Sequence, residues 1–378
     1  MMMLTTTTAV QAGADFKESS HPLRPLFIAP AFSPYHDNSH YSNFHFMQQV
    51  AQEMRLRGAY VSLAGLDGSV STVFNEVVPF TGAPRPNILG RSGSATTEPN
   101  SLQNMIDFAI DGLQSGRYDA VFNFSHDPEP MRVIHPRFIN ITTCCKGMSH
   151  ETDIAILQSM GYGKIVFLAK SHALQYTCLV DMPVCGCPVS VANEEELASG
   201  WELAPSLRLP LFAGRICEEK GVRTALAVAR RLGKPIRFAG FAQDTSLLHE
   251  INRAGCLYMG VLPRDELFRV MSQSSVLLQT QNKNCQEAFG IVTAEALACG
   301  LPTVALDRGA NAEVIEPLNG GVVLRPELPE EETIDWLASK AIEVGQWDAK
   351  RRQHLSRAAR NRFSVQSVVD RLVEAWQR

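Results

Sequence analysis

Two stretches in the second half of the chain carry side chains that could bind a phosphorylated sugar. The first, residues 211–222 (LFAGRICEEKGV), is an apolar run that ends at Gly214, followed by Arg215 and, before a predicted helix, Lys220. Two cations at a strand edge beside a helix N-terminus would neutralise a diphosphate without a metal ion. The alternative is a solvated loop with incidental charges, because the signal alone is only a basic loop.

The second stretch is residues 287–300 (EAFGIVTAEALACG), in which Glu295 falls inside a predicted helix. Its neighbours four residues away are Ile291 and Cys299, so the carboxylate lies on an apolar helical face. Such a carboxylate is costly to bury unless it is partnered. One interpretation is a carboxylate that accepts hydrogen bonds from two ribose hydroxyls; the other is a buried Glu paired with an Arg elsewhere in the core.

The start of the same predicted helix offers further groups for a ligand. Gly290 lets the backbone approach a ligand closely, and Phe289, Gly290 and Ile291 present free amides there. Glu287 and Glu295 do not suit a hydrolase pair, because eight residues at helical rise separate them by about 12 Å. The carboxylates of glycosidases are about 5–9.5 Å apart. The spacing suits two contacts at opposite ends of one extended ligand better than two contacts on either side of one glycosidic bond.

The surrounding pattern predicts an α/β fold with two doubly wound, Rossmann-like domains. From Pro25 onward, short apolar runs alternate with amphipathic segments, which indicates parallel sheets covered by helices on both faces. We expect strands at 25–31, 59–66, 118–124, 138–143, 164–169, 209–213, 235–240, 256–259, 276–280, 303–306 and 321–324. We expect helices at 41–58, 101–116, 151–161, 171–180, 222–232, 245–254, 264–272, 290–299, 331–346, 350–361 and 365–376.

The domain boundaries follow from this alternation. Residues 182–190, with the polar run 193–196, are interpreted as the connection between the domains. The expected division is a flexible leader (1–22), a first Rossmann-like domain (23–190), a second Rossmann-like domain (191–361) and a C-terminal helix (362–378) that packs back on the first domain. Ligands of such folds bind at the carboxyl ends of the strands, so the site is expected in the cleft between the domains.

Composition and missing motifs exclude several classes of protein. The net charge of -4 comes without a basic stripe, which argues against nucleic-acid binding. No G-x-G-x-x-G follows a strand, and there is neither a P-loop nor an Asp-x-Asp pair, so nicotinamide, kinase and metal-clamp chemistry are not expected. Nine scattered cysteines do not form a disulfide framework, and Cys185-Gly-Cys187 is too tight for a zinc pair.

Location is predicted from the same composition. The N-terminus lacks the charge and apolar run of a secretory signal, and no stretch approaches the roughly 20 apolar residues of a membrane span. We therefore expect a soluble, cytoplasmic protein. Peripheral membrane contact stays open.

The second half resembles the C-terminal domain of glycosyltransferase family four, which contains retaining enzymes of the two-domain GT-B type. Glu287 and Glu295 match the family's two glutamates separated by seven residues. The other matches are the G-R-x-x-x-x-K-G segment at 214–221, CGLPTV at 299–304, RGANAEVI at 308–315 and NGG at 319–321. Five motifs in the family's order over roughly 110 residues make the resemblance specific.

The resemblance implies that residues 23–190 form the acceptor domain and residues 191–361 the nucleotide-sugar domain, and it implies a role for each of the matching residues. Arg215 and Lys220 would contact the diphosphate, Glu287 the hydroxyls of the donor sugar, and Glu295 the ribose. The amides of residues 289–291 would lie near the sugar and phosphate. It also implies a front-face reaction, in which the acceptor hydroxyl attacks on the side from which the diphosphate leaves.

The first half departs from the family in the loop after its first strand. This loop, residues 32–43 (FSPYHDNSHYSN), contains no glycine, so a close backbone approach to phosphate there is in doubt. Because His36, Asp37 and His40 make it strongly polar, it is interpreted as an acceptor-binding loop. The alternative is that these polar residues only cap the helix that begins near Ser39.

Three further positions in the first half are weaker candidates. His126 follows the predicted strand 118–124, where the family often has a histidine near the donor sugar. Lys146 and His150, after the next strand, are candidates for the acceptor site. Ser171 is better explained as a helix N-cap.

The combined interpretation is a retaining, metal-independent glycosyltransferase that uses a nucleotide-diphosphate sugar and requires no cofactor. UDP is favoured over GDP on family frequency alone. The acceptor stays open and could be a sugar, a lipid-linked molecule or a small molecule. The oligomeric state also stays open. Two rivals remain: a GT-B nucleotide-sugar epimerase and a non-catalytic nucleotide-sugar binding protein. Product analysis separates the first, because epimerisation needs no acceptor. The joint presence of the cations and both glutamates argues against the second.

Overall fold

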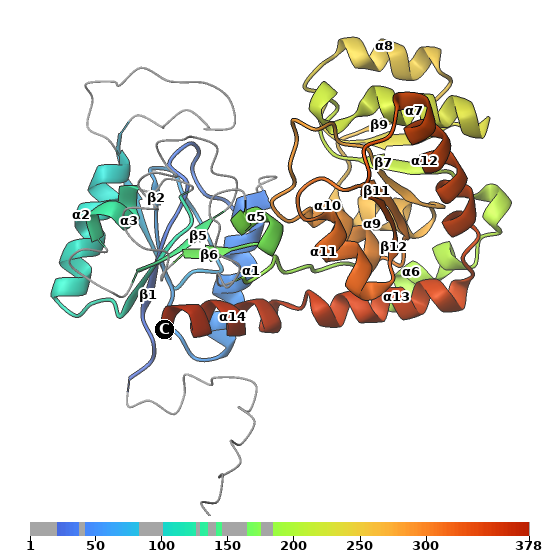
Figure 1. Cartoon of the computed structure of the whole chain (residues 1–378). Helices are drawn as coiled ribbons and strands as arrows, with labels where there is room; N and C mark the ends of the chain where they lie inside the picture. Colours follow the sequence, from blue (N-terminus) through green and yellow to red (C-terminus); the bar gives the residue numbers. More distant parts are fainter. Residues whose placement is uncertain are drawn as a thin grey trace, which may run out of the picture. The chain divides into compact units, whose positions relative to one another are not determined.

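The computed structural model describes residues 21–37, 42–82, 101–125, 129–134, 141–145, 165–174 and 184–377. The chain divides into two compact units, the first comprising the described residues up to Val166 together with the C-terminal segment from Val365, and the second residues 167–364. Two six-stranded sheets are present, and their paired strands run parallel (Figure 1). The predicted α/β class is confirmed.

The first sheet has the strand order β3-β2-β1-β4-β5-β6, so β1 and β4 are neighbours where the winding direction reverses. Strands β1, β2 and β4 are buried along their whole length, because a doubly wound sheet is covered on both faces. The strands are β1 (Pro25–Ile28), β2 (Ser62–Leu66), β3 (Glu76–Phe80), β4 (Ala120–Asn123), β5 (Ile141–Cys145) and β6 (Ile165–Phe167). The described helices of the first half are α1 (Ser42–Leu56), α2 (Ser101–Gln114), α3 (Glu129–Ile134) and α5 (Lys170–Leu174).

The C-terminal helix α14 (Val365–Gln377) belongs to the first unit, where it packs on α1. Arg57, just after α1, forms an ion pair with Asp370, with Nη1 and Oδ1 2.5 Å apart. Gln366 Nε2 donates to Glu53 Oε2 at 3.0 Å. These polar contacts flank the buried apolar face of α14.

The second sheet repeats the same winding, in the order β12-β11-β10-β7-β8-β9. Its strands are β7 (Leu211–Ala213), β8 (Arg237–Ala239), β9 (Leu257–Gly260), β10 (Leu277–Gln279), β11 (Thr303–Leu306) and β12 (Gly321–Leu324). Its helices are α6 (Glu194–Trp201), α7 (Val222–Leu232), α8 (Ser246–Arg253), α9 (Arg264–Ser272), α10 (Ile291–Ala298), α11 (Asn311–Ile315), α12 (Glu330–Gly345) and α13 (Ala349–Arg362). Strands β7 and β10 are neighbours at the reversal point, so the loops after them meet at one edge.

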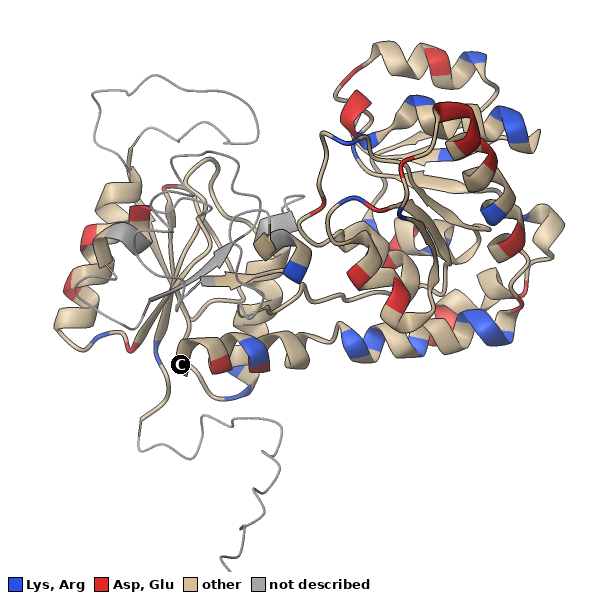
Figure 2. Cartoon of the chain, in the orientation of Figure 1, with Lys and Arg blue, Asp and Glu red and all other residues tan. Residues whose placement is uncertain are grey.

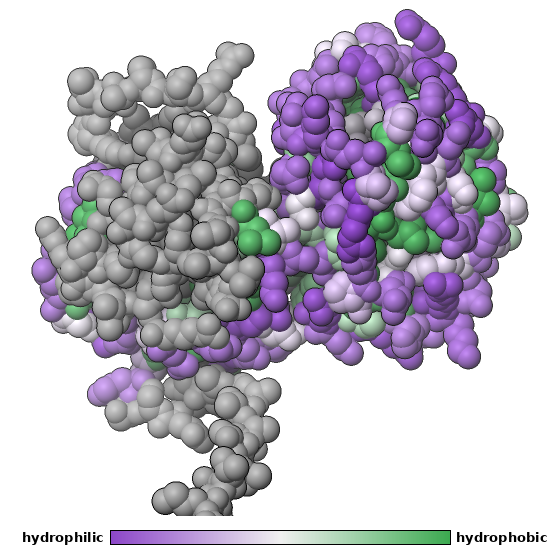
Figure 3. All heavy atoms as spheres, in the orientation of Figure 1, coloured by the Kyte–Doolittle hydropathy of each residue, from purple (hydrophilic) through white to green (hydrophobic). Residues whose placement is uncertain are grey.

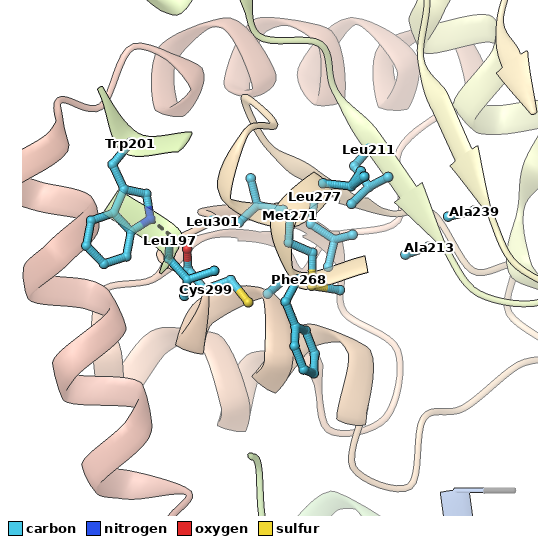
Figure 4. Packing of buried hydrophobic residues seen from close by; sticks show 12 residues of the cluster. Leu197, Trp201, Leu211, Ala213, Ala239, Phe268, Met271, Leu277, Cys299 and Leu301 are labelled. Atoms are coloured by element: carbon cyan, nitrogen blue, oxygen red, sulfur yellow. Dashed lines mark hydrogen bonds between the residues drawn. The ribbon is translucent and has the colours of Figure 1, made fainter. Parts of the chain in front are cut away.

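The polar run 193–196, expected in the connection between domains, instead begins helix α6. Asn193 caps it, since its Oδ1 accepts from the amide of Glu196 at 2.9 Å and its Nδ2 donates to the same residue's carboxylate at 2.6 Å. Leu197 and Trp201 then enter the core of the second unit, where Trp201 Nε1 donates to the carbonyl of Cys299 at 2.8 Å (Figure 4). The prediction was wrong because the acidic first turn of a capped helix was interpreted as a loop.

The surface of the second unit is mixed in charge. Figure 2 shows basic residues on α7 and α13 and mostly acidic residues on α12. The face seen in Figure 3 is mostly hydrophilic, with hydrophobic residues exposed in limited areas. Among the residues that the structure describes, no helix is long and apolar enough to cross a membrane.

Candidate functional site

The loop after β7 places the predicted cations at the carboxyl ends of the strands of the second sheet. Gly214 and Arg215 follow the strand directly, and Lys220 ends a short 3₁₀ turn before α7. Gly221 (φ 76°) joins the two elements, and a Cβ there would come within 1.8 Å of the carbonyl oxygen of Thr280. Only glycine allows this approach, so the N-terminus of α7 lies against the end of β10.

Lys220 and Glu287, 67 residues apart in sequence, form an ion pair in this edge region. Each side chain is 19% exposed. The backbone of Glu287 is fixed from the other side, where the amide of Ala310 donates to its carbonyl at 2.9 Å. The structure thus brings together two groups that the sequence predicted for one donor.

Both members of this pair are charged. Burial by itself would raise the pKa of Glu287, but attraction to Lys220 and hydrogen bonds from Lys220 and Gln281 outweigh it, so the pKa lies below its usual range. Burial would lower the pKa of Lys220, but the charge of Glu287 raises it above its ordinary value. The site therefore holds an ionised carboxylate and an ammonium side by side.

Arg215 remains exposed to solvent beside this pair. Its Nη1 donates to Gln243 Oε1 at 2.6 Å. This hydrogen bond orients the guanidinium without neutralising its charge, because the glutamine side chain is uncharged. Its charge contributes to lowering the pKa of Glu287, so it lies within electrostatic reach of the carboxylate. The guanidinium is thus available to an anionic ligand.

Helix α10 begins at Ile291, shortly after Glu287 and Phe289. Gly290 caps it in the left-handed region (φ 79°), and Ile291 is its first residue. Phe289 is buried, with its ring perpendicular to that of Phe363 at a centroid distance of 5.6 Å. The buried ring anchors the helix start, whose first amides have no partners within the helix.

Glu295 lies in the middle of α10 and is 2% exposed. It forms an ion pair with Arg264, at the start of α9, whose side chain is 37% exposed and stacks over the ring of Phe268 at 5.1 Å. This arrangement agrees with the second interpretation of Glu295, a buried glutamate paired with an arginine elsewhere in the core. A ribose contact remains a proposal, and Arg264 is a partner that the sequence did not identify.

The structure places only part of the predicted acceptor site. His36 is exposed, and its backbone bridges to Val70. Both carboxylate oxygens of Asp37 are engaged: Oδ1 accepts from Ser71 Oγ at 2.6 Å, and Oδ2 accepts from the amide and hydroxyl of Thr72 at 2.7 and 2.9 Å. Asp37 therefore ties its loop to the one after β2.

The remaining candidates in the first half, His40, His126, Lys146 and His150, lie outside the described residues. The turn that leads toward His126 is described as far as Ser125. Asn123 Oδ1 accepts there from the amide and hydroxyl of Ser125 at 3.0 and 2.6 Å.

Gln281 is a site residue that the sequence analysis missed. Its Nε2 donates to Glu287 Oε1 at 3.2 Å and to Gln279 Oε1 at 2.5 Å. The signal was present in the sequence, since the two glutamines flank Thr280 where β10 ends. Polar side chains at the carboxyl end of a central strand are typical of a binding site.

Among the described residues, no group of three or more His, Cys, Asp or Glu side chains could hold a metal ion.

Comparison with known proteins gives a family match within the second unit. Residues 193–362 match the family described as Glycosyl transferases group 1. Over 196 residues the chain is 24% identical to alpha-maltose-1-phosphate synthase of Mycolicibacterium smegmatis. That alignment covers 47% of this chain and 50% of the relative, so it spans half the length of the curated protein.

Solved structures resemble the chain over nearly its whole length. Sucrose-phosphate synthase from Thermosynechococcus elongatus superposes with a TM-score of 0.69 at 15% identity, covering 94% of this chain and 98% of that one. HepE of Anabaena in complex with UDP gives a TM-score of 0.68 at 15% identity, with 93% and 99% covered. The chain has the GT-B fold of two Rossmann-like domains, as predicted. The match of residues 193–362 to Glycosyl transferases group 1 supports a transferase enzyme.

Proposed function

We propose that the chain is a retaining glycosyltransferase that moves a hexosyl unit from a nucleotide-diphosphate sugar, with UDP favoured, to a hydroxyl acceptor. The observation that carries the proposal is the ion pair of Lys220 and Glu287 at the reversal point of the second sheet. It places a cation suited to a diphosphate beside an ionised carboxylate suited to sugar hydroxyls.

Arg215 and Lys220 stabilise the leaving diphosphate in this proposal. The ammonium of Lys220 has three donors. Its bond to Glu287 occupies one, which leaves others for phosphate oxygens. The exposed, planar guanidinium of Arg215 can donate hydrogen bonds to two phosphate oxygens at once. Their positive charges make a metal clamp on the diphosphate unnecessary, so we propose that turnover is metal-independent.

Glu287, Glu295 and the start of α10 bind the rest of the donor. Glu287 accepts from hydroxyls of the transferred sugar, and Glu295 accepts from the ribose. The first amides of α10, from Gly290 onward, lie toward the sugar and phosphate, since a helix N-terminus favours negative charge.

The chemistry proposed for this site is a front-face displacement. The acceptor hydroxyl attacks the anomeric carbon on the face from which the diphosphate departs, and its proton passes to the departing phosphate oxygen. The protein contributes positioning and charge stabilisation and forms no covalent bond to the sugar. His36 and His126 are proposed to contact acceptor and donor sugar, respectively.

The choice of UDP is supported by neighbours of the same fold. HepE of Anabaena has been solved with UDP and with UDP-glucose. Because these neighbours share only the fold with this chain, the nucleotide and sugar are part of the proposal.

The geometry favours transfer over epimerisation. A nucleotide-sugar epimerase needs a carboxyl group that exchanges protons, whereas the cations around Glu287 hold its pKa below the usual range. An ionised Glu287 accepts hydrogen bonds and carries no proton to donate.

The proposal is tested first by ligand binding. Thermal shifts are measured with UDP, GDP, ADP and TDP, followed by release of UDP from UDP-glucose with and without simple sugar acceptors. We expect UDP to give the largest shift and acceptor to accelerate release. Absence of any shift by all four nucleotides would contradict the proposed donor class.

A further inference from the structure

The side-chain amide of Gln281 is held between two acceptors at the end of β10. Gln281 is 1% exposed, and its Nε2 donates to both Gln279 Oε1 and Glu287 Oε1. Since an ionised carboxylate can only accept hydrogen bonds, the nitrogen end of the amide must face Glu287. The orientation of this buried side chain is therefore fixed by the carboxylate.

The opposite end of the same amide is unsatisfied. Gln281 Oε1 is buried and accepts no hydrogen bond from the part of the chain that the structure describes. A buried carbonyl without a partner costs free energy and calls for an explanation. Reversing the amide would turn this oxygen toward the carboxylate of Glu287, which is worse. The molecule thus retains an unsatisfied atom in exchange for the bond to Glu287.

The carboxylate of Glu287 is bound asymmetrically as a result. Its Oε1 receives both Lys220 Nζ and Gln281 Nε2. Its Oε2 receives no hydrogen bond from the described residues, and about a fifth of the side chain is open to solvent. One oxygen is anchored by two donors, and the other has no donor among the described residues.

We propose that Gln281 is a positioning residue for Glu287: together with Lys220 it anchors Oε1, so that Oε2 is presented to a hydroxyl of the transferred sugar. Gln281 itself does not contact the sugar. The inference rests on the proposed function, because the hydroxyl belongs to the proposed donor.

Lys220 alone does not supply this orientation. Its ammonium sits on a flexible four-carbon stem and attracts the carboxylate without a preferred plane. The planar amide of Gln281, held from behind by Gln279, gives the contact a direction. Lys220 is also committed to the diphosphate, so Gln281 keeps the carboxylate in place when the ammonium shares its donors.

Three variants test the role of Gln281. Gln281→Leu removes both of its hydrogen bonds. Gln281→Glu keeps the size but sets a second carboxylate against Glu287. Gln273→Leu is the matched control, because it makes the same change at a residue that caps the distant end of α9.

The first readout separates the sugar from the nucleotide. We expect Gln281→Leu to lower kcat/KM for UDP-glucose by about 10- to 100-fold, since misplacing a reacting contact by an ångström can cost about 10²-fold. The inhibition constant of UDP alone should change less than about two-fold, because the variant leaves the diphosphate cations in place. Gln273→Leu should leave both quantities at wild-type values.

The second readout follows Glu287 directly and requires no turnover. Carboxyl ¹³C NMR of glutamate-labelled protein, assigned with Glu287→Gln, gives the pKa of Glu287. The groups that face it are Lys220, Arg215, Cys285 and Gln281. Loss of the Gln281 bond should raise that pKa in Gln281→Leu, and the like charge in Gln281→Glu should raise it further, moving the acid limb of the rate profile to higher pH.

These readouts keep the two proposals apart. If wild type neither binds nor turns over UDP-glucose, the proposed donor fails, whereas the NMR titration still reports on Gln281. An unchanged Glu287 pKa, or equal losses of UDP and UDP-glucose affinity in Gln281→Leu, would show that Gln281 only fills space at the strand end.

Discussion

At the scale of single residues, the site consists of charged groups whose partners come from distant parts of the sequence. Lys220 meets Glu287, and Glu295 meets Arg264 across 31 positions. The sequence predicted a role for Glu295 because a buried carboxylate is costly without a partner, and it predicted roles for Lys220 and Glu287 from the family motifs. It could not predict which partner each would choose, since that depends on how the loops after different strands meet.

Lys220→Ala should lower kcat by about 10²–10³, the usual cost of removing one donor to a developing anion. Its effect on donor affinity should be smaller, because the charge on the diphosphate grows as the bond breaks. Arg215→Lys should also lower kcat, since the single ammonium of lysine does not reproduce the two parallel hydrogen bonds of a planar guanidinium. Single-turnover rates and donor affinities are the measurements. A Lys220→Ala variant that loses only affinity would assign leaving-group stabilisation to the start of α10.

Glu295→Ala should weaken nucleotide binding, because two charge-assisted hydrogen bonds of roughly 1.5–3 kcal/mol each are lost. Glu295→Gln should be milder. Arg264→Ala is the comparison, since it removes the ion pair and keeps the carboxylate. Calorimetry with UDP and thermal denaturation are measured on all three. Should Glu295→Ala lower stability while binding UDP like wild type, the ion pair with Arg264 would be its main role.

At the scale of elements, hydrophobic periodicity predicted most of the second unit. The bounds of α7, α9, β11 and β12 agree with those expected, because caps and glycines mark their ends. Edge strand β3 was missed because Pro79 and its half-exposed positions weaken the pattern. Helix α6 was missed because its first turn is acidic, although Asn193 and Glu196 form a capping pair.

The turn that carries Lys220 into α7 depends on Gly221. Gly221→Ala should destabilise the protein by about 3 kcal/mol or more, as left-handed strain of about 1–2 kcal/mol adds to overpacking against Thr280. Gly233→Ala, at the other end of α7, has a similar φ of 61° and nothing within 4 Å of the added Cβ. It should cost only the strain. Denaturant unfolding of both variants is the measurement, and equal losses would contradict the close approach at Gly221.

The loop after β1 depends on Asp37 and therefore on pH. Burial would raise the pKa of Asp37, but hydrogen bonds from Ser71 and Thr72 hold it below the ordinary value. Its contribution to stability is therefore present above the unfolded pKa of about 3.9 and is lost as pH falls through the folded pKa. Asp37→Asn should cost about 1–3 kcal/mol at pH 7. This difference from wild type should shrink toward pH 3, as measured by denaturant unfolding, and a pH-independent difference would contradict the role of the charge.

At the scale of the whole molecule, two units wind their sheets in the same order but hold different parts of the proposed site. The proposed donor residues from Gly214 to Glu295 lie within the second unit, where the resemblance of the sequence was specific. The acceptor residues expected in the first unit are only partly described. Sequence therefore predicted the donor half in more detail, because its chemistry is held by short motifs at strand ends.

We propose that this chain transfers a sugar from a nucleotide donor through Lys220 and Glu287 without a metal ion. The most direct measurement follows UDP-glucose in excess EDTA with a panel of hydroxyl acceptors, using ¹H NMR to observe UDP release and the anomeric proton of the product. We predict acceptor-dependent UDP release, a product with the donor's anomeric configuration, and a rate at least about 10²-fold lower in Lys220→Ala. Activity that disappears in EDTA and returns with magnesium or manganese, or an epimerised sugar formed without acceptor, would contradict the account.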